Sequence, residues 1–236
     1  MARHSRLKPK LMLVFLVLVT TTLALWLGLV PQRMSPFEPV DLASNDQWFL
    51  NLRLAALRRD KNLCRKTLLP PYVKSKMVFD KPIKKGCGWY NAVRLSEVGE
   101  ARLSTGTTTC ELAAALSMWM THVVQPAARS NFGSDVARID QMGTYSCRNI
   151  IGNQKWRTVR SQHAKANAID ISGFRLKNGR HIRVLSDWKK ETPNGRFLRQ
   201  IHRRSCRYFR VALSPNYNPA HKDHFHFDRG FFKACR

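Results

Sequence analysis

The chain opens with an apolar run too long for an ordinary core helix. Residues 11–30 cover twenty positions without a charge, and residues 1–10 before them carry four basic side chains and no acid. Twenty residues at the helical rise span about 30 Å, the thickness of a bilayer's hydrocarbon core. Because basic flanks stay in the cytoplasm, this pattern predicts a single anchor with the rest of the chain outside. A cleaved signal peptide is the alternative, although residues 26–31 offer no convincing cleavage site.

The next stretch changes from a proline-rich pattern to a helical one. Residues 31–43 contain three prolines in a polar context and predict a linker. Residues 44–60 predict an amphipathic helix, with Ser44 and Gln47 at capping-box spacing. Four residues should form its buried face: Trp48, Leu52, Ala55 and Ala56. The folded domain is therefore expected to cover residues 44–236.

The clearest helical pattern lies in residues 107–124. Thr108 and Glu111 have capping-box spacing, and Pro126 is expected to end the helix. An apolar stripe at helical spacing should face the core: Leu112, Leu116, Trp119, Met120 and Val123. We assign no chemistry to His122, because a lone histidine on such a helix is usually structural or exposed.

The C-terminal third has the alternating pattern of short strands. Strands are predicted at residues 168–176, 211–213 and 224–228, with a helix over residues 197–209 between the first two, and residues 89–98 suggest an earlier strand. Helices come first and most strands later, which is typical of the α+β class. We expect a small antiparallel sheet flanked by helices and preceded by one transmembrane helix.

Charge and cysteine content indicate an exported protein with an anionic partner. The chain has 41 Lys+Arg against 15 Asp+Glu, a net charge of +26, which favours nucleic acid, an anionic membrane or an acidic wall polymer. Export argues against nucleic acid, and no nucleic-acid-binding motif is present. The 6 cysteines are scattered, which predicts three disulfides, with free thiols as the alternative. Fifteen pairings are possible; Cys206 with Cys235 is favoured because it would brace the C-terminal segment.

The segment HKDHFHFD, residues 221–228, concentrates imidazole groups. It holds three of the chain's 8 histidines. On a strand, His224, His226 and Asp228 would project from one side, while Phe225 and Phe227 would enter the core. Two histidines on one strand face make half of a metal site. A surface cluster of histidines is the plainer interpretation.

The other half is predicted in residues 161–170. His163 precedes Asp170 by seven positions, and a turn at 164–167 would return His163 over the strand that carries Asp170. A bare carboxylate in that apolar strand is expensive unless it is paired or metal-bound, although Asp170 could simply cap a turn. Two imidazoles with one carboxylate are a typical catalytic zinc set, which leaves a fourth position for water.

The order of these residues resembles a known family. Ser-x-His-x6-Asp followed far downstream by Asp-His-Phe-His is similar to the zinc D-Ala-D-Ala-type peptidases and, more widely, to metallopeptidases that share a fold with lysostaphin and the hedgehog signalling domain. The nearest resemblance is to the bacterial extensin-like C-terminal domain family, over about residues 63–236. It rests on CGW at 87–89, QPAA at 125–128, YSCR at 145–148 and the terminal HFHFD.

The resemblance implies a role for each site residue. His163, Asp170 and His226 match the zinc (Zn2+) ligands. Asp223 matches an acidic general base, and His224 matches a catalytic imidazole that stabilises an oxyanion or serves as the rival base. On a strict strand Asp223 faces away from the metal, so it reaches the site only if the strand begins after it.

Three further residues are expected at the substrate, and two positions differ from the residues that are usual in the resembling family. We expect Arg148, Ser161 and His221 to contact substrate; their plainer roles are a surface arginine, a turn cap and an exposed loop residue. Gln162 stands where Glu is common. Ala166 stands where Gly is usual, and it would strain a turn that needs positive φ.

Together these features predict a zinc-dependent peptidoglycan peptidase that cuts an amide next to a D-centre. The expected location is the bacterial inner membrane, crossed once by residues 11–30, with residues 1–10 in the cytoplasm and the domain in the periplasm. Such an enzyme could serve a trans-envelope machine. A non-catalytic wall-binding or envelope-complex module on the same fold is the main alternative, and nucleic-acid binding is a remote third.

Overall fold

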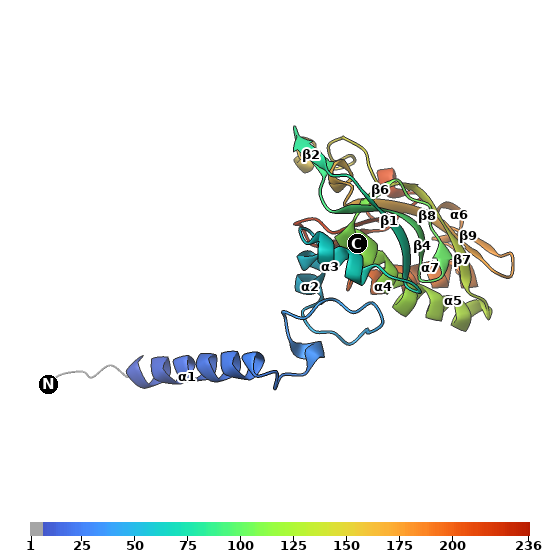
Figure 1. Ribbon diagram of the computed structural model, residues 1–236. Coiled ribbons are helices and arrows are strands. Elements are labelled where there is room, and N and C mark those ends of the chain that lie inside the picture. The colour runs from blue at the N-terminus through green and yellow to red at the C-terminus, as the bar shows by residue number, and fades with distance from the viewer. Residues whose placement is uncertain (1–6) are drawn as a thin grey trace.

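The computed structural model describes residues 7–236, and most of residues 1–10, the expected cytoplasmic tail, lies outside them. Helix α1, Leu7–Trp26, extends away from a compact domain (Figure 1). Among the described residues, α1 is the one helix long and apolar enough to cross a membrane. A helix of this kind near an N-terminus is typical of a membrane anchor and of a signal sequence alike.

The domain is built on one large mixed sheet. Within residues 7–236 this sheet has 10 strands, in the order β1-β4-β5-β7-β8-β11-β10-β12, with β6 beside β4 and β9 beside β8. The strands are β1 Val73–Val78, β4 Ala92–Val98, β5 Ala101–Arg102, β6 Thr107–Thr109, β7 Val136–Gly143, β8 Ala168–Leu176, β9 His181–Arg183, β10 Val211–Leu213, β11 Phe225–Asp228 and β12 Ala234–Cys235. Strands β2 Lys81–Lys84 and β3 Cys87–Trp89 form a separate hairpin.

This sheet corrects one prediction and confirms another. A mixture of helices and strands in one domain is confirmed, but the expected small antiparallel sheet is wrong in size, and the pairs β5–β7 and β10–β12 are parallel. The strand suggested at residues 89–98 is present as β4, and the strands that were not predicted in this sheet before helix α4 are β1, β5 and β6, in a stretch where lysine, glycine and proline obscure the alternation. The strands expected at residues 168–176, 211–213 and 224–228 are confirmed almost residue for residue.

Helices cover one face of the sheet, where α4, α5 and α7 lie together (Figure 1). The helices are α2 Leu50–Ala56, α3 Lys61–Thr67, α4 Cys110–Trp119, α5 Gln125–Phe132, α6 Val184–Asp187 and α7 Pro193–Ser205, with a π-helical turn at Met120–Val124 and short 3-10 turns at Gln32–Met34, Gln154–Trp156, Gln162–Lys165 and Pro219–His221. Every residue of α4 is buried. The Trp119 ring lies 5.0 Å from Phe227 and 6.1 Å from Phe174, which places the core between α4 and the strands of the predicted site.

The predicted apolar stripe of residues 107–124 is confirmed as buried, but the ends of the helix differ from the prediction. The cap is Thr109, whose hydroxyl accepts from the Leu112 N–H, instead of Thr108. Pro126 does not end the helix. It occupies the first turn of α5, where its missing N–H would have had no intrahelical partner.

The N-terminal part of the domain departs further from the prediction. Helix α2 begins only at Leu50, and Trp48 and Leu52, which were expected in the core, are each 55% exposed. The buried positions are instead Leu50, Leu54 and Leu57. Helix α2 has apolar residues on two sides, and periodicity alone does not distinguish the side that packs.

Residues 31–43, the predicted linker, are packed onto the domain. Val40 and Leu42 belong to the core cluster, each 4% exposed. The buried Arg53 guanidinium donates to the backbone carbonyls of Gln32 and Ser35. This segment is therefore held in place along most of its length.

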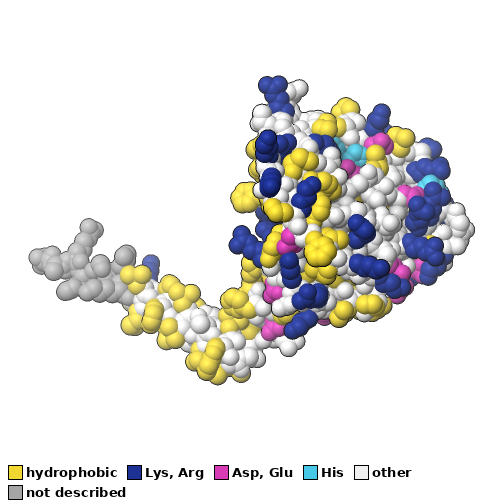
Figure 2. Space-filling model, turned by 45° about the horizontal axis from the view of Figure 1, so that its top comes forward, with side chains coloured by type: hydrophobic (Ala, Val, Ile, Leu, Met, Phe, Trp, Pro, Cys, Tyr) yellow, Lys and Arg dark blue, Asp and Glu magenta, His cyan; other side chains and the backbone are white. Residues whose placement is uncertain are grey.

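Three disulfides brace the domain, as the cysteine pattern predicts. They join Cys64 to Cys110, Cys87 to Cys147, and Cys206 to Cys235. The pairing expected for Cys206 is confirmed, and the alternative of free thiols is wrong. Basic side chains are spread over the face seen in Figure 2, in keeping with the net charge of +26, and acidic ones are fewer.

Candidate metal centre

Strand pairing brings the two halves of the predicted site together. Strands β8 and β11 are antiparallel neighbours, and His226 lies directly opposite Asp170 in their register. Directly opposed residues have Cβ atoms about 5 Å apart, so their side chains meet on the same face. Phe225 and Phe227 are fully buried on the other face, as the alternation predicts.

A tight turn adds the third side chain. The Ser161 hydroxyl caps the 3-10 turn by accepting from the His163 N–H at 3.3 Å, and Ala166 then takes a left-handed conformation with φ of 52°. This reversal returns His163 over the start of β8. The predicted strain at Ala166 is thus confirmed, and the capping role foreseen for Ser161 is present.

The three side chains form a close triangle of donor atoms. His163 Nε2 lies 3.2 Å from Asp170 Oδ1 and 3.2 Å from His226 Nδ1, and His226 Nδ1 lies 2.9 Å from Asp170 Oδ1. A tetrahedral zinc ion with bonds of about 2.0–2.1 Å separates its ligand atoms by roughly 3.3 Å. Both the spacing and the chemistry of this set, two imidazoles and one carboxylate, fit a zinc ion.

Without an ion, the His226 imidazole is protonated near neutral pH and is paired with carboxylates. Burial disfavours the charged form of His226, but hydrogen bonds to Asp170 and Asp228 outweigh it and raise its pKa to about 9. Burial also opposes ionisation of Asp170, yet His163 and His226 together hold the pKa of that carboxyl well below its ordinary range. Near neutral pH, a cation binding here must therefore displace a proton from His226.

Asp228 orients His226 from behind. Its Oδ2 lies 3.3 Å from His226 Nε2, and its Oδ1 accepts from the Gly230 N–H at 2.8 Å. Carboxylates that bind the far nitrogen of a ligand histidine fix the ring and raise its basicity. The sequence analysis placed Asp228 on the correct face but gave it no role; its spacing of two from His226 was the available signal.

His224 and Asp223 form a hydrogen-bonded pair beside the triangle. Strand β11 begins at Phe225, which frees Asp223 from the strand's alternation, and its Oδ1 lies 2.8 Å from His224 Nδ1. A carboxylate oxygen accepts in such a bond, so Nδ1 donates to Asp223 and the second ring nitrogen, Nε2, is turned toward the triangle. That Nε2 lies 3.6 Å from Asp170 Oδ1, at the edge of the triangle.

His221 is close to the site and neutral. Its ring centroid lies 5.2 Å from that of His224, and its Nδ1 lies 2.7 Å from Asn218 Oδ1. Burial and the neighbouring His226 and His224 lower its pKa to about 4. The ring is therefore a polar, uncharged part of the cleft wall near neutral pH.

The triangle opens into a cleft of about 600 Å³. His221, His224, Arg148 and Ser161 all line it, so the structure brings the predicted substrate-contacting residues to one cavity. A ring pair, Trp156 and Phe232 with centroids 4.8 Å apart, forms an apolar part of the wall. The sequence analysis missed this wall because its two members lie far apart in the chain.

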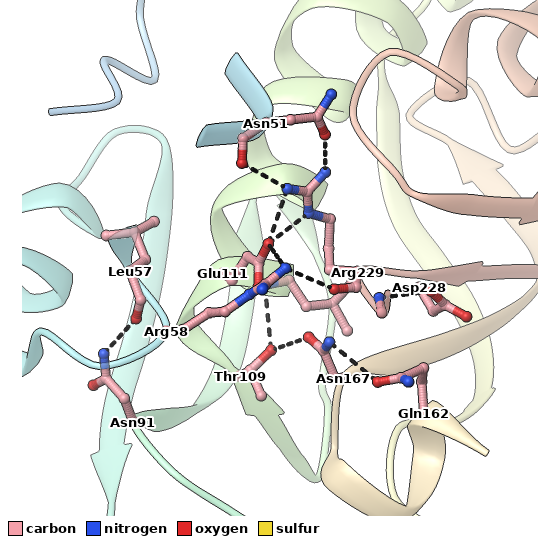
Figure 3. Close-up of polar contacts among 12 residues, drawn as sticks. Asn51, Leu57, Arg58, Asn91, Thr109, Glu111, Gln162, Asn167, Asp228 and Arg229 are labelled. Atoms are coloured by element: carbon pink, nitrogen blue, oxygen red, sulfur yellow. Dashed lines mark hydrogen bonds and ion pairs between the residues drawn. The ribbon is translucent and has the colours of Figure 1, made fainter. Parts of the chain in front are cut away.

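A buried ion pair holds the end of β11 against the helices. Figure 3 shows Arg229 between Glu111 of α4 and Asn51 of α2; its Nε lies 3.0 Å from Glu111 Oε1 and its Nη1 lies 2.6 Å from Asn51 Oδ1. The Arg229 N–H donates to the carbonyl of Asn167, just after the turn that carries His163. Because Arg229 follows Asp228 directly, this network also places the carboxylate behind His226.

These features define a mixed α and β domain with a histidine and carboxylate cluster at the base of a cleft. The model of the family described as extensin-like protein C-terminus matches residues 62–236, and the chain belongs to that family. No curated protein and no solved structure matches the chain.

Proposed function

We propose that the domain is a zinc-dependent peptidase of peptidoglycan, which hydrolyses stem-peptide or cross-link amides next to a D-centre. The observation that carries this proposal is the triangle of His163, Asp170 and His226 with the free nitrogen of His224 at its edge. The order of these residues along the chain, which resembles that of D-Ala-D-Ala-type peptidases, supports the choice of substrate. Carboxypeptidase and endopeptidase activities are both compatible with this set.

In this proposal the three triangle residues would hold the ion. When bound, zinc supplies Lewis-acid polarisation of the amide carbonyl and makes water a stronger nucleophile. His224 Nε2 accepts the proton of the attacking water and later donates it to the leaving amine. Asp223 holds the ring in the required tautomer and stabilises its protonated form. The proposal thus adopts the sequence-based alternative in which His224 is the base, and it gives Asp223 an orienting role, since the Asp223 carboxylate binds the far side of the His224 ring.

The walls of the cleft would position the peptide. Arg148 offers a cation to a substrate carboxylate, which stem peptides carry at their ends and side chains. His221, held neutral, offers a hydrogen bond without attracting a second anion. Ser161 is occupied by capping its turn, which leaves it a supporting role in the wall.

The proposed location is the periplasmic side of the inner membrane. Three disulfides favour an oxidising compartment, and α1 offers a single span with the domain beyond it. The net charge of +26 suits an acidic, polyanionic wall. Hydrolysis at a fixed place near the membrane would suit local opening of the wall, as a trans-envelope machine requires.

A non-catalytic module that grips peptidoglycan is the second candidate. The observation in its favour is the strained turn at Ala166, with φ of 52°, next to the ligand His163. The two candidates differ in whether bound muropeptides are cut.

The deciding experiment is a digest by the full chain in detergent, loaded with zinc and incubated with cross-linked muropeptides. Mass spectrometry should show loss of a terminal alanine or conversion of dimers to monomers. His226→Ala should abolish cleavage, whereas His181→Ala, which alters a histidine bonded to Asp140 away from the cluster, should leave it intact. Binding without cleavage by folded, metal-loaded protein would favour the module, and neither binding nor cleavage would refute both candidates.

A further inference from the structure

The apolar side of α2 that was expected in the core faces outward. Trp48 and Phe49 just before the helix are 55% and 53% exposed, and Leu52 is 55% exposed. Phe37, in the packed segment before it, is 81% exposed. We name these four residues the α2 apolar surface. Three large aromatic side chains gathered in water are unfavourable unless another phase or molecule covers them.

Hydrogen bonds of the backbone place Trp48 against the segment that carries Phe37. The Trp48 N–H donates to the carbonyl of Arg33 at 2.8 Å, which places the start of α2 against residues 32–35. Phe37 follows closely, with its N–H directed to Ser35 Oγ at 3.3 Å. The start of the α2 apolar surface therefore lies beside the chain that leads from α1, and Phe37 follows four residues after Arg33.

Arg53 fixes this area relative to the end of α1. Its side chain is only 3% exposed, and its guanidinium donates to the carbonyls of Gln32 and Ser35 and, at 3.1 Å, to Gln47 Oε1. Such a buried cation with several acceptors holds all of them in one arrangement. The domain is thus attached to the chain from Gln32 onward.

The connection between the uncharged run and the segment bound by Arg53 is very short. The uncharged run ends at Val30, two residues before the attachment, and two residues reach at most about 7 Å. The polar layer on each side of a bilayer is about 5–8 Å thick. If residues 11–30 cross the bilayer, the attached segment lies at the level of the headgroups. Figure 2 shows hydrophobic side chains that continue from α1 onto the adjoining part of the domain.

We propose that the α2 apolar surface inserts into the interface of the same bilayer that α1 crosses, so that the domain rests on the membrane. Tryptophan and phenylalanine suit this layer because their rings are apolar while the indole N–H meets headgroups. The net charge of +26 adds attraction to anionic lipids. This inference rests on α1 as a membrane span and is independent of metal binding and hydrolysis.

The test measures contact between Trp48 and lipid. The full chain is reconstituted in vesicles of phosphatidylethanolamine and phosphatidylglycerol, with or without bromine near the top of the acyl chains, which quenches nearby tryptophan. The emission of Trp48 is obtained as the difference between wild type and Trp48→Phe. It should fall by roughly half in brominated vesicles. The matched difference for Trp156→Phe, a partly exposed residue of the cleft wall, should not change.

A second variant separates insertion from misfolding. Phe49→Ser with Leu52→Ser removes exposed apolar groups only, so near-UV circular dichroism should stay the same while quenching of Trp48 decreases. Unquenched Trp48 emission in vesicles where Trp26 is quenched would overturn the proposal, and if that unquenched emission is blue-shifted, the surface is covered by a second copy of the chain instead. If Trp26 is also unquenched, the proposal fails together with the anchor.

Discussion

The strands of the candidate metal centre and the segment before α2 are held in opposite ways. Strands β8 and β11 share a ladder of backbone hydrogen bonds, with Phe225 and Phe227 buried behind it. The segment at residues 31–47 has no strand partner within the described chain, and one buried guanidinium, that of Arg53, binds it at several points. The first arrangement relies on a backbone ladder, whereas the second relies on side chains: the Arg53 guanidinium binds its carbonyls, and Val40 and Leu42 add contacts to the core.

The two regions can therefore be changed separately. Substitutions in the triangle change buried polar groups that are paired with one another, and they leave the backbone ladder and the phenylalanines behind it in place. A substitution of Arg53 should free the N-terminal segment and leave the centre intact. The predictions below test this separation, beginning with the largest effect.

Asp170→Asn should reduce zinc affinity by more than about 100-fold, since losing an outer partner alone costs 10–100-fold. The variant should keep its fold, because the ladder and the core behind it are unchanged. Competition with a chromophoric chelator measures the affinity, and circular dichroism checks the fold. Asp140→Asn, which alters a carboxylate bonded to Arg175 and His181, is the control and should bind zinc normally. Normal zinc binding by Asp170→Asn would exclude the proposed centre.

His202 should make the layer beneath the centre sensitive to acid. Burial lowers its pKa to about 4, while an unfolded histidine titrates near 6.5. As the pH falls, the unfolded chain therefore takes up the proton first. The contribution of His202 to the free energy of unfolding is fully present above about pH 6.5 and is lost as the pH drops to about 4. The loss should be about 3 kcal/mol.

The measurement is the free energy of unfolding in urea at pH 7 and pH 4, compared with His202→Phe. Phenylalanine suits the aromatic surroundings formed by Trp188, Phe225 and Phe227. The variant should lose about 3 kcal/mol less than wild type over this interval. An identical loss in both proteins would contradict a buried neutral His202.

Arg53→Met should destabilise the N-terminal segment by about 2 kcal/mol, because buried carbonyls lose their donor. Proteolysis should then occur within residues 31–47, while zinc affinity stays unchanged. Arg33→Met is the matched control, since Arg33 forms an exposed ion pair with Asp46 and should contribute under about 1 kcal/mol. A parallel loss of zinc affinity in Arg53→Met would show that the two regions are coupled.

Zinc affinity should depend on pH through His226. Since its pKa in the ion-free protein is about 9, affinity should fall about tenfold for each pH unit below that value. Calorimetry at pH 7 in buffers of different ionisation enthalpy should show the release of about one proton. Affinity that is constant between pH 6 and pH 8 would contradict the paired imidazolium.

Ala166→Gly should give the smallest effect, a stabilisation of up to about 1 kcal/mol. A left-handed conformation is unfavourable for alanine and is open to glycine. Ala164→Gly, in the ordinary part of the same turn, should instead destabilise by about 1 kcal/mol. Thermal unfolding compares the two, and a destabilised Ala166→Gly would mean that the turn carries no strain.

The parts of the structure that could be predicted are those set by residues close together in the sequence. The alternation of residues 224–228 correctly predicted the inward phenylalanines, because one face of a strand must be buried. The spacing of His163 and Asp170 suggested the returning turn. The positive φ of Ala166 was expected from the family resemblance, since glycine is usual at that position.

Other features depended on distant contacts that no local pattern contains. Trp48 and Leu52 share a helical face just as well as Leu50 and Leu54 do, and only the tertiary fold decides which face packs. The turn at Met120–Val124 let the helix pass Pro126, which local rules treat as an end. The bond between Asp223 and His224 appears only once the start of β11 is known.

The two borders of the large sheet have a consequence for solubility. Strand β1, at one border, places Lys74 and Lys76 along its length, and β12, at the other, has only two residues. Charged or very short edge strands discourage pairing with a second chain. A sheet of this size would otherwise be a template for aggregation, so replacing both lysines with valine should convert a monodisperse domain into one that self-associates.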